Sequence, residues 1–204
     1  MTSGLRFGPL GHEALHLCID MQQLFDRGAP WAMPWMARVL PTVHEIASHH
    51  AARTVFTRFM PPRQPRDMPG AWQRYYERWA NVTLAQLDPA LLDLAPPLQA
   101  LCPPARVLDK AVYSPWTEGH LDRMLAGSGI NTLVITGGET DVCVLATVMG
   151  AVDRGFRVVL VEDAMCSSND TTHDALLSLY RSRFGAQIET ADAVSVLLNW
   201  DPPG

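Results

Sequence analysis

The sequence predicts an α/β protein built on a parallel sheet, and three observations support this fold class. Short apolar runs of strand length recur along the chain, and they are nearly continuous rather than alternating, as in strands covered on both faces. Segments with helical character lie between these runs. Glycine and clusters of Ser, Asn and Asp mark helix boundaries. Such strand–helix alternation predicts parallel strands joined by right-handed crossovers.

Six segments are predicted as strands, at residues 14–19, 54–57, 106–108, 132–136, 157–161 and 187–189. Four segments are predicted as helices, at residues 35–49, 119–126, 142–154 and 171–183. The third helix has apolar residues at positions 142, 145, 146, 149 and 152, and Gly155 supplies its C-terminal stop. The fourth helix follows a polar turn whose side chains can cap it.

The segment between residues 61 and 104 interrupts the alternation because it is rich in proline. It is predicted to be largely loop with short helices. A long ordered excursion within a compact domain usually forms a lid, a pocket wall or a subunit contact. We therefore expect a homodimer or homotetramer rather than a monomer.

Length and composition limit the class of protein. The 204 residues are expected to form one domain spanning residues 1–204. The net charge of −5 argues against nucleic-acid and anionic-membrane partners, which reward clustered Lys and Arg. Neither a membrane-length apolar run nor a secretory signal pattern is recognised, so a cytoplasmic location is expected. The four cysteines lack a CxxC spacing and are interpreted as reduced thiols.

Three chemically capable residues, Asp20, Lys110 and Cys143, lie at or just beyond the carboxyl ends of predicted strands. Ligands of open α/β sheets bind at this edge, so the three side chains are expected to meet there. Each has an ordinary interpretation: Asp20 can cap a turn, Lys110 can be solvated, and Cys143 can pack beneath a helix. Their joint occurrence at one edge favours chemistry.

Together these residue types suit hydrolysis of an amide by a thiol. The acid takes the thiol proton and later donates it to the leaving amine, while the cation steadies the negative charge. Cys143 is expected in the first turn of a helix, where the dipole can lower its pKa well below the ordinary value of about 8.5. Backbone N–H groups of that turn can also hold an oxyanion.

Three stretches, CIDMQQLF, VLDKAVYSPW and VITGGETDVCVLATVMGAVDRGFRVVLVEDA, resemble the isochorismatase-like cysteine hydrolase superfamily. The resemblance implies a catalytic triad of Asp20, Lys110 and Cys143. It also implies a three-layer α/β/α sandwich around a six-stranded parallel sheet of order 3-2-1-4-5-6. It further implies a cis peptide bond between Gly138 and Glu139, which brings the backbone N–H of Glu139 beside that of Cys143 as an oxyanion hole.

The chain departs from two branches of that superfamily. Nicotinamidases carry an Asp-x-His pair and a further His for a metal, whereas TVFTRFMPPRQPRDMPGAW contains no histidine. We therefore expect no metal and no other cofactor, and nicotinamide is a poor candidate substrate. True isochorismatases lack the cysteine in the family pattern, so Cys143 favours hydrolysis of a C–N bond.

The residues predicted to contact a small-molecule substrate follow the second and third strands or lie in the proline-rich segment. They are Arg58, Trp72, Tyr76, Trp79, Tyr113 and Trp116. Arg58 could bind a substrate carboxylate or form a structural salt bridge. The aromatic residues at positions 72, 75, 76 and 79 have helical spacing, so most of them can serve packing alone.

The sequence thus predicts a metal-independent cysteine amidohydrolase that acts on a small amide or ureido (carbamoyl) compound through a thioester. One rival is a cysteine-independent hydrolase of an enol or vinyl ether that uses Asp20 and Lys110. Another is a non-catalytic small-molecule-binding protein of the same fold. A nucleotide-binding Rossmann protein is disfavoured because TGGETD lacks the G-x-G-x-x-G spacing.

Overall fold

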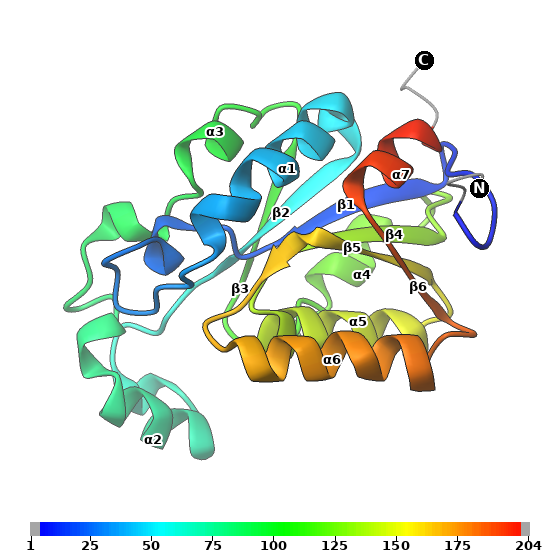
Figure 1. The fold of residues 1–204 in the computed structure, drawn as a ribbon. Helices are drawn as coiled ribbons and strands as arrows, with labels where there is room; N and C mark the ends of the chain where they lie inside the picture. Colours follow the sequence, from blue (N-terminus) through cyan, green and yellow to red (C-terminus); the bar gives the residue numbers. More distant parts are fainter. Residues whose placement is uncertain (1–4, 201–204) are drawn as a thin grey trace.

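The structure, a computed structural model, describes residues 5–200 and has a six-stranded sheet at its centre (Figure 1). All neighbouring strands pair in parallel, and the strand order is β3-β2-β1-β4-β5-β6. The strands are β1 (Ala14–Ile19), β2 (Thr54–Phe59), β3 (Arg106–Lys110), β4 (Thr132–Gly138), β5 (Arg157–Cys166) and β6 (Ile188–Ala191). The predicted fold class and strand order are confirmed.

Helices cover both faces of the sheet and make three layers (Figure 1). One face carries α1 (Met36–His49), α3 (Pro96–Gln99) and α7 (Ala193–Leu198). The other face carries α4 (His120–Leu125), α5 (Leu145–Asp153) and α6 (Asp170–Arg183). Every residue of β1 and β4 is buried, as the continuous apolar runs predict for strands covered on both sides.

The proline-rich segment forms loop and short helices, as predicted. It contains α2 (Ala71–Arg78), α3 and the 3-10 turns Pro65–Asp67, Ala80–Val82 and Pro89–Leu92. Two further 3-10 turns are Gln23–Phe25 and Ala51–Arg53. Helix α2 lies beyond the carboxyl ends of the strands, where it can form a wall of a ligand site (Figure 1).

Two predicted element boundaries were wrong in an informative way. The helix predicted from residue 142 starts as a π-helical turn, Thr140–Val144, and becomes α-helical only at Leu145. Strand β5 continues to Cys166 rather than ending at residue 161. Its pairing with β4 is shifted between Ile135 and Gly137, an irregularity that apolar patterning does not encode.

Within residues 5–200, no helix is long and apolar enough to cross a membrane.

Candidate active site

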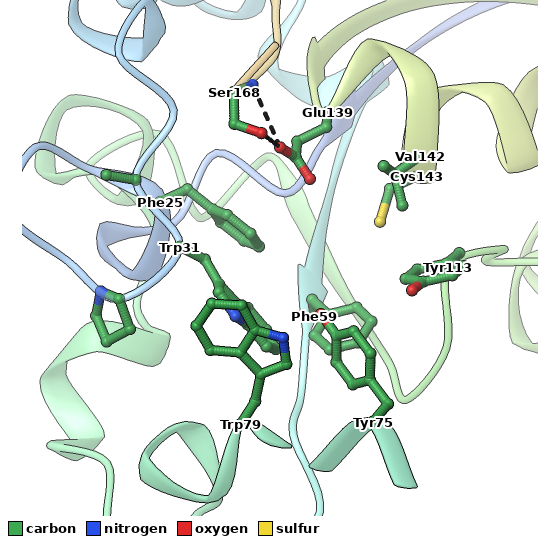
Figure 2. A pocket seen from close by; sticks show the side chains of 12 residues that line it. Phe25, Trp31, Phe59, Tyr75, Trp79, Tyr113, Glu139, Val142, Cys143 and Ser168 are labelled. Atoms are coloured by element: carbon green, nitrogen blue, oxygen red, sulfur yellow. Dashed lines mark hydrogen bonds between the residues drawn. The ribbon is translucent and has the colours of Figure 1, made fainter. Parts of the chain in front are cut away.

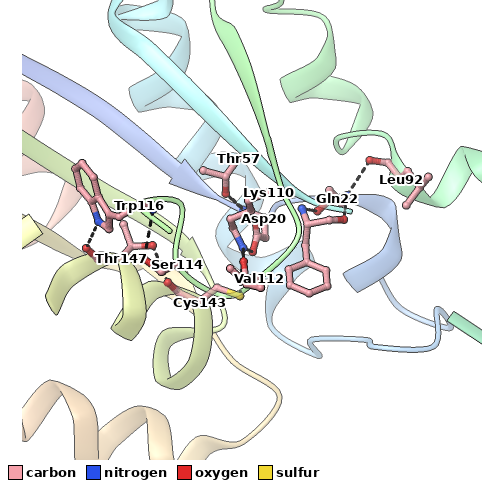
Figure 3. A network of polar contacts seen from close by, with 11 residues as sticks. Asp20, Gln22, Thr57, Leu92, Lys110, Val112, Ser114, Trp116, Cys143 and Thr147 are labelled. Atoms are coloured by element: carbon pink, nitrogen blue, oxygen red, sulfur yellow. Dashed lines mark hydrogen bonds and ion pairs between the residues drawn. The ribbon is translucent and has the colours of Figure 1, made fainter. Parts of the chain in front are cut away.

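Lys110 reaches Asp20 although its strand lies at the edge of the sheet. The Lys110 Nζ donates to Asp20 Oδ2 at 2.7 Å and to the carbonyl oxygen of Val112 at 3.3 Å. Both charged side chains are only 1% exposed. The long lysine side chain passes the end of β2, and its ammonium group lies 4.8 Å from the ring centre of Phe59. Figure 3 shows the resulting meeting point at the carboxyl ends of the strands.

Thr57 holds the Asp20 carboxylate on the side away from Lys110. Its hydroxyl donates to Asp20 Oδ1 at 2.5 Å and accepts from the backbone N–H of Asp20 at 3.1 Å. Asp20 has a φ of 50°, in the left-handed region that Asp tolerates better than most residues. The carboxylate is therefore fixed by one hydroxyl and one ammonium group.

Cys143 approaches the same pair from β4. The Lys110 Nζ lies 3.5 Å from the Cys143 Sγ, and the Cys143 side chain is buried in the π-helical turn. The peptide bond between Gly138 and Glu139 is cis, at the bond that the family resemblance indicates. The three residues that the sequence analysis singled out thus meet in one cluster (Figure 3).

Burial and the neighbouring charges shift the pKa of the Cys143 thiol. Burial, and then the negative charge of Asp20, raise the pKa of Cys143 well above its ordinary value, and Lys110 only partly opposes them. The expectation of a lowered thiol pKa was therefore wrong, because burial and the adjacent carboxylate outweigh the helix dipole. Burial alone lowers the pKa of Lys110, but Asp20 and Cys143 outweigh that effect and raise it.

A second polar network holds the turn that carries Cys143. Thr140 donates its hydroxyl to the carbonyl of Cys166 and hydrogen-bonds His173 Nδ1 at 2.9 Å. The Asp141 carboxylate accepts hydrogen bonds from the hydroxyls of Ser167 and Thr172. His173 is buried, and its hydrogen bond to Thr140 supports this turn.

A cavity of about 320 Å³ opens in front of the Cys143 sulfur, and Figure 2 shows its walls. It lies within the size range of small-molecule sites. Aromatic rings form most of the walls, and the polar side of the cavity comes from Glu139 and Ser168. The full lining is Phe25, Pro30, Trp31, Ala32, Phe59, Tyr75, Trp79, Tyr113, Glu139, Val142, Cys143 and Ser168.

Of the aromatic residues predicted to contact substrate, Trp79 and Tyr113 line this cavity. Trp72 and Tyr76 do not: Tyr76 is fully buried, and Trp72 packs on it with ring centres 6.2 Å apart. Tyr75 lines the cavity one helical turn before Trp79, so the pair at i and i+4 forms the exposed edge of the aromatic face of α2. The helical spacing identified the aromatic face but not which ring reaches the cavity.

Arg58 does not reach the cavity, contrary to the substrate-binding prediction. Its guanidinium group makes two hydrogen bonds to Asp109, at 2.8 and 2.9 Å, and an ion pair with Asp93 at 3.5 Å. Successive residues of a strand point to opposite faces, and Phe59, the next residue, lines the cavity. Arg58 therefore points away from the cavity, to the opposite face of the sheet, where it forms salt bridges.

Trp116 also lies outside the cavity. Its indole N–H donates to the carbonyl of Thr147 at 2.9 Å, and its ring stacks on Phe156 with centres 5.7 Å apart. A Cβ atom on Gly150 would lie 2.2 Å from the Trp116 ring. The tryptophan therefore packs against the bare face of α5 and does not contact a ligand.

Several residues of the site escaped the sequence analysis. Thr57 holds Asp20, and Phe25, Trp31 and Phe59 form cavity walls. Gln22 is fully buried and links the ends of two strands, since its Oε1 accepts from the Phe59 N–H at 2.6 Å. For Gln22, Thr57 and Phe59 the available signal was position, because they lie at or just beyond the carboxyl ends of the first two strands. Phe25 and Trp31 lie further along the loop after β1 and carried no such signal.

Among residues 5–200, no group of three or more His, Cys, Asp or Glu side chains could hold a metal ion. The neighbouring histidines His49 and His50 lie in different environments. His50 is buried against Trp200, with ring centres 3.9 Å apart, whereas His49 is exposed.

Known proteins resemble this chain over most of its length. The family model described as the isochorismatase domain matches residues 14–192. An uncharacterized isochorismatase family protein of Bacillus subtilis is 35% identical over 81 residues, which are 40% of this chain and 44% of that protein. The matched stretch thus spans less than half of that relative. Nicotinamidase 3 of Arabidopsis thaliana is 26% identical over 79% of this chain and 77% of its own length.

Solved structures confirm the fold. The crystal structure of a cysteine hydrolase from Pseudomonas syringae pv. phaseolicola superimposes with a TM-score of 0.79 at 20% identity. The superposition covers 98% of both chains. At this level of identity the likeness concerns the fold alone.

Proposed function

Because the chain belongs to the isochorismatase family, we propose that it hydrolyses a C–N bond in a small amide or ureido compound, with Cys143 as nucleophile. The geometric observation that carries this proposal is the cluster of Lys110 Nζ, 2.7 Å from Asp20 and 3.5 Å from the Cys143 sulfur, at the base of a ligand-sized cavity. The similarity to a nicotinamidase supports the same class of reaction.

Asp20 acts as the general base in the first half of the reaction. Its carboxylate takes the proton from the Cys143 thiol as the sulfur attacks the carbonyl carbon, and a C–S bond forms. Lys110 remains protonated and stabilises the negative charge shared by the two groups. The backbone N–H groups of Glu139 and Cys143 hold the developing oxyanion.

Asp20 then acts as the general acid. It returns the proton to the substrate nitrogen, the C–N bond breaks, and ammonia or an amine leaves a thioester on Cys143. In the second half, Asp20 takes a proton from water as the water oxygen attacks the thioester. The C–S bond breaks, the sulfur regains a proton, and a carboxylic or carbamic acid is released.

The protonated resting thiol fits this scheme. A thiol whose pKa is raised by burial and by Asp20 needs a base at the moment of attack, and Asp20 is the carboxylate in the cluster. A non-catalytic member of the family has no need for a buried Asp–Lys ion pair beside a thiol. The desolvation cost of burying both charges can exceed the energy of their attraction, so the pair demands a reason beyond stability.

Ammonia release from a panel of primary amides and ureides tests the proposal. We expect Cys143→Ala to abolish turnover of any hydrolysed compound, and Cys143→Ser to leave less than about 1% of it, because a hydroxyl is a far weaker nucleophile. Cys102→Ala is the matched control, since that thiol lies outside the cavity. Full activity in Cys143→Ala would refute the thioester route and favour the cysteine-independent rival.

A further inference from the structure

The cavity in front of Cys143 combines aromatic walls with a single carboxylate. Six of its lining residues are aromatic: Phe25, Trp31, Phe59, Tyr75, Trp79 and Tyr113. Trp31 stands at the centre of this wall, with its ring centre 5.8 Å from that of Phe59, 5.9 Å from Tyr75 and 6.1 Å from Trp79. The faces of such rings attract cations, and tryptophan does so most strongly.

Of the residues that the structure describes, Glu139 alone supplies a carboxylate to the lining. Ser168 donates its backbone N–H at 3.2 Å and its hydroxyl to one oxygen, Oε1, of this carboxylate. The other oxygen has no hydrogen-bond partner among residues 5–200, and Figure 2 shows it directed toward the aromatic side chains. This charge is held in place by neutral donors only.

Within the described part of the chain, residues 5–200, no cationic side chain lines the cavity to balance Glu139. Lys110 lies behind Cys143 and is paired with Asp20. Arg58 is paired with Asp109 on the opposite face of the sheet, and the Arg78 guanidinium lies over the Trp79 ring at 5.9 Å without lining the cavity. With Asp20 and Lys110 cancelling and the thiol neutral, the site carries one net negative charge.

We propose that this site is selective for substrates whose non-reacting end is a cation, such as a quaternary or protonated amine, seated between the aromatic wall and the Glu139 carboxylate. A carboxylate at that end would face Glu139 without a compensating cation. The proposed substrate charge is opposite to the negative charge expected from Arg58 in the sequence analysis. The proposal rests on the proposed function in one respect, because the bound compound is a substrate only if the protein hydrolyses it. The selectivity for charge is a property of the cavity alone.

A series of three soluble probes of similar shape tests the selectivity without turnover. The cation is choline, the neutral probe is 3,3-dimethylbutan-1-ol, and the anion is 3,3-dimethylbutanoate. Each is titrated against quenching of tryptophan fluorescence, since Trp31 and Trp79 line the cavity, and against protection of Cys143 from iodoacetamide, followed by peptide mass spectrometry. We expect choline to reach half of its maximal quenching and protection at a concentration about tenfold lower than the neutral probe. The anion should give the weakest quenching and protection.

Glu139→Gln keeps the shape of the side chain and an oxygen that can accept from Ser168. It should remove most of the preference for choline over the neutral probe. Glu118→Gln makes the same change in charge on the exposed surface and should leave the preference intact. The proposal would be overturned if choline and the neutral probe bound equally well by these two readouts, or if the anion bound more tightly than either. It would also be overturned if none of the probes bound.

Hydrolysis of 4-(trimethylammonio)butanamide, 5,5-dimethylhexanamide and 5-amino-5-oxopentanoate separates the two proposals. A preference for choline with no hydrolysis of any amide or ureide leaves the selectivity standing and refutes the proposed function. Hydrolysis that favours the anionic 5-amino-5-oxopentanoate supports the function and refutes the selectivity.

Discussion

At the scale of single residues, the two oxygens of the Asp20 carboxylate have different partners. One oxygen faces Lys110, and the other faces the hydroxyl of Thr57. A carboxylate that moves a proton must keep its orientation while its charge changes. In the proposed reaction Thr57 is therefore a positioning residue that acts through Asp20, and its effect can be measured.

Replacing Thr57 by Val removes the hydroxyl while keeping the shape of the side chain. We expect kcat to fall about tenfold to a hundredfold with little change in KM, because the carboxylate loses a buried hydrogen bond worth about 1.5–3 kcal/mol. Thr57→Ser keeps the hydroxyl and should recover most of the rate. Equal losses in both variants would show that Thr57 matters only for packing.

Sequence reasoning found the residues of the cluster but misjudged their surroundings. Asp20, Lys110 and Cys143 could be identified because parallel strands bring their carboxyl ends to one edge. Arg58 was misplaced because the side of a strand to which a residue points depends on the register, which the four residues TVFT of the predicted strand do not define. The thiol pKa was misjudged because the burial of Cys143 and its nearness to Asp20 depend on segments that are far apart in the sequence.

At the scale of elements, α2 and α5 have different relations to the cavity. Helix α2 turns one edge of its aromatic face toward the ligand, with Tyr75 and Trp79 one turn apart. Helix α5 instead packs Gly150 against the ring of Trp116, whose indole N–H is bonded to the carbonyl of Thr147. The tryptophan thereby fixes the loop after β3 against the helix that follows Cys143.

Gly150→Ala tests this packing. An alanine normally stabilises a helix by about 1 kcal/mol relative to glycine. Here its Cβ would lie 2.2 Å from the Trp116 ring, so we expect the free energy of unfolding to fall by about 1–3 kcal/mol. Urea denaturation measures the change, and Gly150→Ala combined with Trp116→Leu should recover part of it. An increase in stability in the single variant would contradict the close contact.

Boundaries of elements were the least predictable part of the fold. The four predicted helices all exist, since amphipathic spacing over a dozen residues is a strong signal. The π-helical turn at Thr140–Val144 was not predicted, because a change in hydrogen-bond register leaves no mark in residue type. The oligomeric state stays a prediction, which sedimentation equilibrium would measure.

At the scale of the whole molecule, two buried histidines make stability depend on pH. Burial lowers the pKa of His16 to about 3, and His16 bonds Thr54 and Thr136 in the core. Burial also lowers the pKa of His50 to about 4. In the unfolded chain both groups titrate near 6.5, so the unfolded state binds more protons below that pH.

The free energy of unfolding should therefore fall as the pH drops from about 6.5 towards 4. The slope from these two groups approaches about 1.4 kcal/mol per pH unit for each histidine. Urea denaturation at pH 7, 6, 5 and 4 measures it. His12→Gln, at a side chain that is 91% exposed, should not alter the slope. Equal stability at pH 7 and pH 5 would contradict the burial of neutral histidines.

The central claim is that Asp20 activates a resting Cys143 thiol, and one measurement tests it most directly. The rate of Cys143 alkylation by iodoacetamide is followed against pH by peptide mass spectrometry, with the half-buried Cys102 as an internal reference. Hydrolysis is assayed in parallel, in the wild type and in Asp20→Asn.

In the wild type we expect the alkylation of Cys143 to rise only above the ordinary pKa of a cysteine thiol, because burial and Asp20 raise the pKa of Cys143. Asp20→Asn removes the negative charge and leaves Lys110, so alkylation should begin at lower pH while hydrolysis falls by about 10²–10⁴-fold. An unchanged alkylation profile in Asp20→Asn, or a Cys143 in the wild type that titrates below its ordinary value, would contradict the account.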